Sequence, residues 1–301
     1  MVYTVTFNPA LDYVMNLDSI STDDINRTCS EELYYGGKGI NVSAILTRLE
    51  IPNIALGFTA GFTGQKIKEM MDRDGIKNDF IELDNGFTRI NVKIKFGKEL
   101  DINANGPEIG KDKIEELLRK LGNLNSGDFL VLAGSVPSAL PDDLYSKILE
   151  KLEDNGINAV VDTTGNQLLN VLKYKPFLIK PNHHELSELF GEEMDTTEKI
   201  TVYARKLKEM GAKNVLVSRG GNGALLIDEY GKVYPRDAVD GKLVNSVGCG
   251  DSMVAGFMYG YFENRDYLHA FRMGLATGSA SAFSEYLATR EEVEAVYRQF
   301  R

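Results

Sequence analysis

Hydrophobic residues along the chain fall into short β-branched runs that alternate with segments of helical period. The runs predict six strands, at Val2–Phe7, Ile54–Phe58, Asp128–Leu132, Ala159–Asp162, Phe177–Lys180 and Val215–Ser218. Between most of them, apolar residues recur at helical spacing, as in Ile114–Leu121, Leu144–Leu152 and Tyr203–Met210. Repeated strand-then-helix order predicts an α/β protein with a mostly parallel sheet and helices on both of its faces.

Two regions depart from this order and predict a second, smaller sheet. Asp12–Leu17 and Glu31–Tyr35 look like short strands joined by a polar loop. Thr88–Phe96 alternates strictly between apolar and polar residues, and a short turn leads it into Glu99–Asn103. Strict alternation predicts a strand with one buried face and one wet face, unlike a central parallel strand. We therefore expect a small antiparallel sheet beside the main one, suited to serve as a lid or as a dimer surface.

Composition and charge narrow the classes of function. The 301 residues are 43% hydrophobic and 26% charged, which is typical of a globular protein with a sizeable core. With 34 Lys and Arg against 44 Asp and Glu, the net charge of -10 argues against a general nucleic-acid binder but allows a small anionic substrate. Two cysteines and three histidines are too few for a zinc site built from them. The chain shows neither a signal-peptide pattern nor an apolar run of about 20 residues, so we expect a cytoplasmic protein.

The sharpest local motif is the glycine-rich stretch Asn245–Phe257. Gly248 and Gly250 flank the start of a predicted apolar helix. Successive backbone N–H groups can therefore point at one anion, and the helix N-terminus adds its partial positive charge. Asp251 lies within this cradle. It fits a general base that takes a proton from an alcohol beside a phosphoryl group, and a plain N-cap after a flexible turn is the alternative.

A second glycine-rich stretch, Gly36–Ser43, opens another predicted helix. Its spacing matches neither a Walker A loop nor a dinucleotide-binding fingerprint. The glycines allow a ligand to approach the backbone closely, and Lys38 and Asn41 supply side-chain donors. A structural turn is the alternative reading of this stretch.

Three weaker motifs accompany these two. Asn182 and Glu185 follow a predicted strand and begin a helix, where they either face a cleft or cap the helix. The segment Ser218–Gly223 ends another strand, at the edge where open α/β sheets bind ligands, although a hairpin turn fits equally. Asp12 is an early acid on a predicted lid strand, with a solvated turn carboxylate as its alternative.

Taken together and in this order, these motifs resemble the PfkB family of carbohydrate kinases, the ribokinase-like group. Gly36–Ser43 resembles the N-terminal signature of the family, and Asn245–Phe257 resembles its C-terminal Gly-x-Gly-Asp signature. The resemblance spans essentially the whole chain. It implies one ribokinase-like domain over residues 1–301, a three-layer α/β/α unit with a discontinuous β-sheet lid from about residues 12–35 and 88–103.

Within the family, four segments resemble the bacterial 1-phosphofructokinase subgroup, namely Thr6–Tyr13, Thr88–Lys95, Gly134–Pro137 and Ser279–Ser284. This resemblance implies ATP-dependent phosphorylation of fructose 1-phosphate to fructose 1,6-bisphosphate. Tagatose-6-phosphate kinases share much of the pattern and are the nearest alternative. A catalytically silent sugar- or nucleotide-binding regulator on the same fold is a further alternative, which the intact Gly-x-Gly-Asp and Asn-x-x-Glu motifs disfavour.

The resemblance also implies a role for each residue of the motifs. Asp251 would be the general base, and the amides of Gly248, Cys249 and Gly250 would form the anion hole. Substrate binding would fall to Asp12, Gly37, Asn41, Asn103 and Ser135, with Lys38, Arg89 and Arg27 as cations for the phosphate that the substrate already carries. Arginine suits that phosphate because it donates two parallel hydrogen bonds.

On the nucleotide side, the resemblance implies binding of ATP with Mg²⁺. The residues would be Lys180, Asn182, Glu185, Ser218, Gly220, Gly223, Ala276 and Ser279. Of these, Asn182 and Glu185 would lie in the region of the Mg²⁺ and act on it indirectly. A homodimer through the lid is also compatible with the resemblance.

The chain departs from the family pattern at four positions. Asn245 stands where the C-terminal signature usually begins with Asp, a residue that helps to form the ion site in relatives activated by a monovalent cation, so the K⁺ dependence is open. Cys249 replaces the usual Ala, and its place at a helix N-terminus predicts a lowered thiol pKa and sensitivity to oxidation. Ala104 and Asn105 replace Gly and Pro in a lid segment, which bears on sugar specificity.

Overall fold

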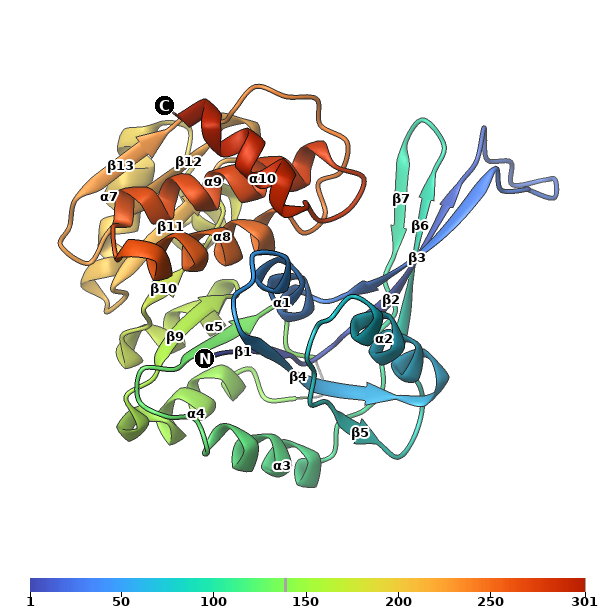
Figure 1. Cartoon of the computed structure of the whole chain (residues 1–301), viewed down its shortest axis with the longest axis horizontal. Helices are drawn as coiled ribbons and strands as arrows, with labels where there is room; N and C mark the ends of the chain where they lie inside the picture. The colour runs from blue at the N-terminus through green and yellow to red at the C-terminus, as the bar shows by residue number, and fades with distance from the viewer. Residues whose placement is uncertain (138–139, 301) are drawn as a thin grey trace.

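A nine-stranded sheet forms the centre of the computed structural model, which describes residues 1–137 and 140–300 (Figure 1). The strand order is β13-β12-β11-β10-β9-β8-β1-β4-β5. Neighbours from β11 to β5 pair in parallel, whereas β12 and β13 are antiparallel. The strands are β1 Val2–Thr6, β4 Asn53–Ala60, β5 Ile81–Leu83, β8 Phe129–Ala133, β9 Asn158–Asp162, β10 Leu178–Ile179, β11 Asn214–Ser218, β12 Ala224–Ile227 and β13 Val233–Arg236.

The six predicted strands are all present in this sheet, which confirms the mostly parallel α/β architecture. Three further strands lie at its two edges and were not predicted. β5 has only three residues, and β12 and β13 form an antiparallel hairpin after β11. Short edge strands carry too little periodic pattern to be recognised from one sequence.

Helices cover both faces of the sheet. They are α1 Lys38–Arg48, α2 Gly61–Arg73, α3 Lys111–Leu121, α4 Leu144–Lys151, α5 Gly165–Val171, α6 His183–Phe190, α7 Thr197–Glu209, α8 Cys249–Asn264, α9 Tyr267–Phe283 and α10 Arg290–Tyr297. One hydrophobic cluster joins the sheet to α1, α2, α8, α9 and α10, and a second joins its other face to α3 through α7. The fold is therefore the expected three-layer α/β/α arrangement.

The paired helices α8 and α9 position the glycine turn that precedes α8. Both helices are largely buried, and they pack together closely because Gly256 of α8 lies directly against Thr277 of α9. A Cβ at Gly256 would come within 2.2 Å of Thr277 Oγ1. This close contact holds the N-terminal end of α8 beside the carboxyl ends of the parallel strands, where open α/β sheets bind ligands.

The second sheet stands off the main one and has the strand order β3-β2-β6-β7 (Figure 1). Its strands are β2 Ala10–Asn16, β3 Ser30–Gly36, β6 Arg89–Lys95 and β7 Glu99–Ile102, and we call this sheet the lid. The expectation of a purely antiparallel lid is wrong, because β2 and β6 pair in parallel. Both strands leave the main sheet in the same direction, since Ala10 at the start of β2 pairs with Arg89 at the start of β6.

Alternation suggests that the apolar face of the lid is buried and the polar face is exposed. The structure shows the reverse. Asp12 and Asn91, on the polar face, are only 8% and 7% exposed. Leu33, Leu100 and Ile102, on the apolar face, are 43%, 43% and 53% exposed. The polar face is buried because it closes over a cavity at the carboxyl ends of β1 and β8, which leaves the apolar face turned outward.

Candidate active site

The glycine turn before α8 places Asp251 at the centre of the site. Gly248 precedes the helix with a φ of 77°, a left-handed conformation that glycine adopts without strain. Asp251 lies in the first helical turn, is 5% exposed, and accepts a hydrogen bond of 2.8 Å from Asn41 Nδ2 of α1. The two glycine-rich motifs, 210 residues apart at this bond, therefore meet in space.

The surroundings of Asp251 raise its pKa to about 6. Burial is the largest cause, and the negative charge of Asp162 adds to it. Lys38, the hydrogen bond from Asn41, and Lys180 act in the opposite direction. A carboxyl group with this pKa is ionised at neutral pH and is still basic enough to accept a proton from a hydroxyl group.

Asp162 and two lysines form a charge cluster beside Asp251, and Asp162 is not among the residues predicted from the sequence. Asp162 ends β9 and is 1% exposed. Its Oδ2 lies 3.3 Å from Lys38 Nζ, and its Oδ1 lies 3.4 Å from Lys180 Nζ. Burial raises the pKa of Asp162, but the charges of Lys180 and Lys38 outweigh it and lower the pKa. An acid at the carboxyl end of an apolar strand is the sequence signal that would have found it.

Lys38 lies between the expected sugar side and the expected nucleotide side of the site. Burial lowers the pKa of its ammonium group, but the carboxylates of Asp162, Asp251 and Glu185 outweigh this and raise it. Asp251 belongs to the first turn of α8, and Glu185 belongs to the predicted nucleotide side. Lys38 also lines the cavity under the lid, so one cation faces both the expected sugar and the expected nucleotide.

A cavity of about 300 Å³ lies between the lid and the carboxyl ends of β1 and β8 in the main sheet. Seven of the eight predicted substrate-binding residues line it, namely Asp12, Gly37, Lys38, Asn41, Arg89, Asn103 and Ser135. Gly248 and Asp251 line the same cavity, so the predicted base and the predicted sugar site share one space. Arg27 is exposed in the loop that joins β2 to β3 and is not among the lining residues.

The inner face of the lid contributes two residues that sequence reasoning left out, Asn91 and Lys93. Asn91 Nδ2 donates a hydrogen bond of 2.8 Å to Asp12 Oδ1. Lys93 Nζ pairs with Asp101 Oδ1 at 3.0 Å, and its side chain is 11% exposed. Strict alternation had placed both residues on the face of Arg89, and that shared face was the signal that would have identified them.

Arg89 connects the lid to two loops of the cavity wall. Its Nε donates to the carbonyl oxygen of Asn8 at 3.2 Å, and its Nη1 donates to that of Ala104 at 3.2 Å. Burial lowers the pKa of Arg89, while the charge of Asp12 opposes the shift. A guanidinium group that these two bonds hold at the cavity wall can donate its remaining N–H groups to a phosphate.

On the nucleotide side, Asn182 and Glu185 form a reciprocal cap of α6. Asn182 Oδ1 accepts a hydrogen bond from the Glu185 backbone N–H, and Glu185 Oε2 accepts one from the Asn182 N–H, both at 2.8 Å. The capping alternative is therefore realised in the structure. An isolated parallel bridge joins Asn182 to Ser218, which brings the Asn-x-x-Glu motif next to the turn that follows β11.

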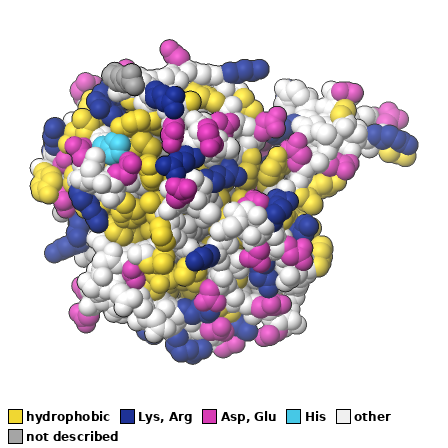
Figure 2. Space-filling view, viewed as in Figure 1, with side chains coloured by type: hydrophobic (Ala, Val, Ile, Leu, Met, Phe, Trp, Pro, Cys, Tyr) yellow, Lys and Arg dark blue, Asp and Glu magenta, His cyan; other side chains and the backbone are white. Residues whose placement is uncertain are grey.

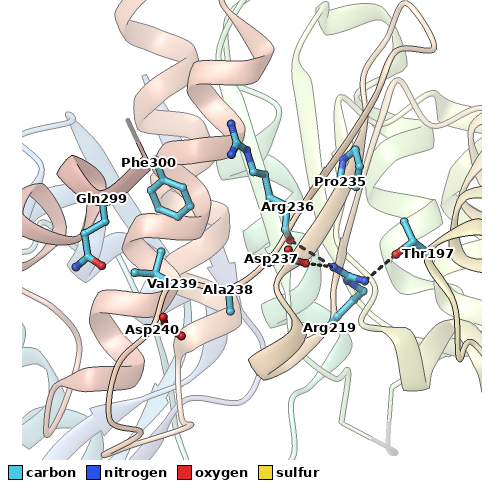
Figure 3. A pocket seen from close by; sticks show the side chains of 10 residues that line it. All are labelled: Thr197, Arg219, Pro235, Arg236, Asp237, Ala238, Val239, Asp240, Gln299 and Phe300. Carbon is cyan, nitrogen blue, oxygen red and sulfur yellow. Dashed lines mark hydrogen bonds and ion pairs between the residues drawn. The ribbon is translucent and has the colours of Figure 1, made fainter.

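The turn after β11 is a tight connection into β12. Gly223 has a φ of 84°, and a Cβ there would lie 2.1 Å from the carbonyl oxygen of Arg236, so this turn requires glycine. Two adjoining cavities, of about 650 and 520 Å³, open beside the turn and share Arg219. Figure 3 shows the smaller one, in which Arg219 donates to Thr197 Oγ1 at 2.9 Å.

None of the eight predicted nucleotide residues is among those that line these two cavities. Two of the eight, Ala276 and Ser279, lie on α9. Ala276 is 0% exposed and belongs to the hydrophobic cluster around α8 and α9. Ser279, one turn further along α9, is half-buried. Neither lines the two cavities beside Gly223, and in this conformation Ala276 has no free surface for an adenine.

The expectation of a lowered pKa at Cys249 is wrong. Burial, followed by the negative charge of Asp251, raises the pKa of this thiol to about 11. Its Sγ lies 3.4 Å from the carbonyl oxygen of Asn245, to which it donates. Burial and a neighbouring carboxylate thus outweigh the lowering effect of a backbone hydrogen bond, which favours the protonated thiol and disfavours its oxidation.

Asn245 joins two loops through its side-chain amide. Its Nδ2 donates to the carbonyl oxygen of Glu285 at 3.1 Å, and its Oδ1 accepts from the Val247 N–H at 3.0 Å. Glu285 lies just after α9, whereas Val247 leads into the glycine turn before α8. A neutral amide therefore links the loops at the position where a cation-activated relative would carry an acid.

The surface, the potential metal ligands and the helices of the described residues add three further facts. Acidic and basic side chains are interspersed over the face shown in Figure 2. Among residues 1–137 and 140–300, no three His, Cys, Asp or Glu side chains gather in a way that would hold a metal ion. No helix in the described part of the chain has the length and hydropathy needed to cross a bilayer.

Comparison with known proteins agrees with this geometry. The pattern of the pfkB family carbohydrate kinases matches residues 5–293. The chain is 46% identical over 294 residues to the 1-phosphofructokinase of Bacillus subtilis (strain 168), covering 98% of this chain and 96% of that protein. It is 36% identical over 302 residues to a D-tagatose-1-phosphate kinase of Bacillus licheniformis, covering 100% and 99%.

Among solved structures, phosphofructokinase-2 of Escherichia coli, in complex with substrates and products, superposes with a TM-score of 0.94 at 26% identity. The superposition covers 99% of this chain and 98% of that one. The same protein has been solved with potassium and in a tetrameric inhibited form. The family match includes both glycine-rich signatures. The chain therefore belongs to the PfkB family of carbohydrate kinases.

Proposed function

We propose that this chain transfers the γ-phosphoryl group of ATP to the free primary hydroxyl of fructose 1-phosphate, forming fructose 1,6-bisphosphate and ADP. The observation that carries the proposal is that Asp251, Asp12 and Arg89 line one cavity, so a base, a hydroxyl-binding group and a phosphate-binding cation converge. The 46% identity to the Bacillus subtilis 1-phosphofructokinase supports the choice of sugar. The Bacillus licheniformis relative makes tagatose 1-phosphate the alternative, in place of the 6-phosphate considered from the sequence.

Phosphoryl transfer requires in-line positioning and stabilisation of charge more than covalent chemistry. Asp251 accepts the proton of the sugar hydroxyl as the hydroxyl oxygen attacks the γ-phosphorus of ATP. The bond from that phosphorus to the bridging oxygen of ADP breaks. The backbone amides of Gly248, Cys249 and Gly250, at the start of α8, would hold the phosphoryl oxygens. Lys38 and Lys180, beside them, add positive charge.

The cavity also offers unused acceptors for the sugar hydroxyls. Asn41 Oδ1 and Asn91 Oδ1 are buried and, among the described residues, have no hydrogen-bond partner. A buried amide oxygen without a partner is costly, so a ligand hydroxyl that donates to it is favoured. Arg89 and Lys93 would hold the existing phosphate at the lid, at a distance from the reacting hydroxyl.

Mg²⁺ would enter this site with ATP. It is held by one or two carboxylates together with phosphate oxygens and water, so a site without an all-protein cage fits it. The carboxylate of Glu185, fixed by its bond to the Asn182 N–H, would hold the ion, directly or through water. When bound, Mg²⁺ neutralises charge on the phosphates.

The contacts of Asn245 favour turnover that does not depend on K⁺. A monovalent cation is bound by acidic and carbonyl oxygens, but here an amide N–H occupies the Glu285 carbonyl. The two loops are already joined without an ion. The potassium complex of the Escherichia coli phosphofructokinase-2 concerns that protein alone.

The outward apolar face of the lid supports a homodimer. Leu33, Leu100 and Ile102 are all more than 40% exposed on one face of a four-stranded sheet. An exposed apolar face on a monomer is a marker of an interaction surface. A second copy of the same face, packed against it, would bury these side chains.

The direct test is release of ADP from ATP and Mg²⁺ in the presence of fructose 1-phosphate. We expect turnover in the wild-type chain. Binding of sugar phosphate without any turnover would favour the silent regulator instead.

A further inference from the structure

The steps assigned above give no task to Asp162, although its carboxylate lies at the centre of the charge cluster. It is 1% exposed, and each of its oxygens faces an ammonium group, Lys38 Nζ at 3.3 Å and Lys180 Nζ at 3.4 Å. The two lysines come from different elements, because Lys38 begins α1 and Lys180 directly follows β10. A buried carboxylate needs partners of this kind, and here both partners are groups that the reaction uses.

The two lysines reach different parts of the site. Lys38 lines the sugar cavity, with 39% of its side chain exposed. Lys180 has a side chain only 6% exposed, and its Nζ lies 3.0 Å from the place that a Cβ on Gly250 would take. Long lysine side chains have many rotamers and like charges repel, so both ammonium groups need a shared anion to hold one arrangement.

We infer that Asp162 is a positioning residue, which holds Lys38 and Lys180 on the two sides of the phosphoryl group during transfer. It touches neither sugar nor nucleotide and acts through the two ammonium groups. The inference rests on the proposed function, because the two cations have this task only if a phosphoryl group passes between them.

Removal of the Asp162 charge has a second, measurable effect on Asp251. The charged or titratable groups around Asp251 are Asp162 of β9, Lys38 of α1, Lys180 after β10 and Cys249 of its own helix. Without Asp162, one repulsion is lost and the two lysines are less neutralised. Both changes favour the ionised form of Asp251, so its pKa falls.

The variant Asp162→Asn tests the inference, because it keeps the shape of the side chain and removes its charge. We expect kcat to fall by about 10²-fold, the scale that a displacement of about 1 Å costs. We also expect the acidic limb of the kcat–pH profile to move to lower pH than in the wild type. A purely structural role would lower the yield of folded enzyme and leave the kcat of the folded fraction unchanged.

Three results would overturn the inference. They are a kcat equal to that of the wild type, an acidic limb that does not move, and recovery of turnover in excess Mg²⁺, which would make Asp162 a metal ligand. If Asp162→Asn does not fold, Asp162→Glu replaces it, because it keeps the charge and shifts it by one methylene. That variant should lose turnover while its acidic limb stays in place, and wild-type turnover in it would contradict the inference.

Asp128→Asn is the matched control. Asp128 is also buried, 8% exposed, and pairs with a cation, the N-terminal ammonium group at 3.0 Å. It precedes β8, at the amino ends of the parallel strands, whereas Asp162 lies at their carboxyl ends. We expect its kcat and pH profile to match the wild type.

A measurement without substrate separates the role of Asp162 from the choice of substrate. The pKa of Asp251, followed by carboxyl-carbon NMR in the free protein, should be lower in Asp162→Asn than in the wild type. That shift is expected whichever phosphosugar the wild type accepts. Lack of turnover on fructose 1-phosphate would therefore count against the proposed substrate, whereas an unmoved pKa of Asp251 would count against the role of Asp162.

Discussion

At the scale of single residues, Asp251 meets two opposed requirements. Burial and the charge of Asp162 raise its pKa from 3.8 to about 6 in the folded chain. A raised carboxyl pKa means that folding favours the protonated form. The stability that this group contributes is present below pH 3.8 and is lost as the pH rises through about 6. Catalysis needs the ionised form, so activity rises over the interval in which stability falls.

Because the charge of Asp251 favours activity and disfavours stability, Asp251→Asn should change both, in opposite directions. Loss of a general base should lower kcat by about 10²–10⁴-fold. Relief of the buried charge should raise the free energy of unfolding at pH 7 by up to about 3 kcal/mol, at 1.36 kcal/mol per unit of pKa. In the wild type, kcat should fall with a slope of one proton below a pH of about 6.

Rates across pH and urea unfolding at pH 7 measure both parts of this prediction. Turnover in Asp251→Asn equal to that of the wild type would refute the assignment of the base. A variant that is less stable than the wild type at pH 7 would refute the account of its buried charge.

Single residues also show what one sequence can reveal about the site. Asp251 and Asn41 were found because each lies in a glycine-rich motif of fixed spacing, and the structure joins them by a hydrogen bond. Asp162 escaped notice because its importance arises from two lysines that lie far from it in the sequence. At Cys249 the helix terminus was recognised, but burial, which depends on the whole fold, decides the pKa.

At the scale of elements, the lid also shows which features the sequence can predict and which depend on the whole fold. Alternation along 88–96 predicted a strand and the two sets of residues on its faces, and both agree with the structure. It could not tell which face is covered, because that depends on the cavity beneath the lid. The order β3-β2-β6-β7 also rests on pairing between segments about 80 residues apart, which no local pattern encodes.

The lid carries the proposed phosphate site, and Arg89→Ala tests it. Loss of a charged hydrogen bond costs about 1.5–3 kcal/mol, so the KM for fructose 1-phosphate should rise by roughly 10–100-fold with a smaller change in kcat. Lys98→Ala is the control, because Lys98 is an exposed cation in the turn between β6 and β7. If steady-state kinetics give the same KM for both variants, the lid does not hold the phosphate.

The loops joined by Asn245 carry a prediction about ions. Because its amide already occupies the Glu285 carbonyl, we expect equal kcat/KM in K⁺ and in tetramethylammonium at constant ionic strength. Strong activation by K⁺ would show that these loops bind the ion in spite of the amide. The matched variant Asn245→Asp, which restores the usual acid, should show the greater response to K⁺ of the two proteins.

At the scale of the whole molecule, the lid face leads to an expected oligomeric state. Sedimentation of the wild type should give a dimer, and Leu100→Glu should shift it to the monomer because a charge on that face opposes burial. Val202→Glu serves as the control, since Val202 is 53% exposed on α7, away from the lid. Unchanged association in Leu100→Glu would place the interface elsewhere.

The central claim concerns the molecule as a sugar-phosphate kinase, and one comparison tests it most directly. ADP release with ATP and Mg²⁺ would be measured for fructose 1-phosphate, tagatose 1-phosphate, tagatose 6-phosphate, fructose 6-phosphate and free fructose. The shared cavity of Asp251, Asp12 and Arg89 predicts the highest kcat/KM for fructose 1-phosphate and very little turnover of free fructose. A preference for free fructose would contradict the account, because the cations of the lid would then have no phosphate to bind.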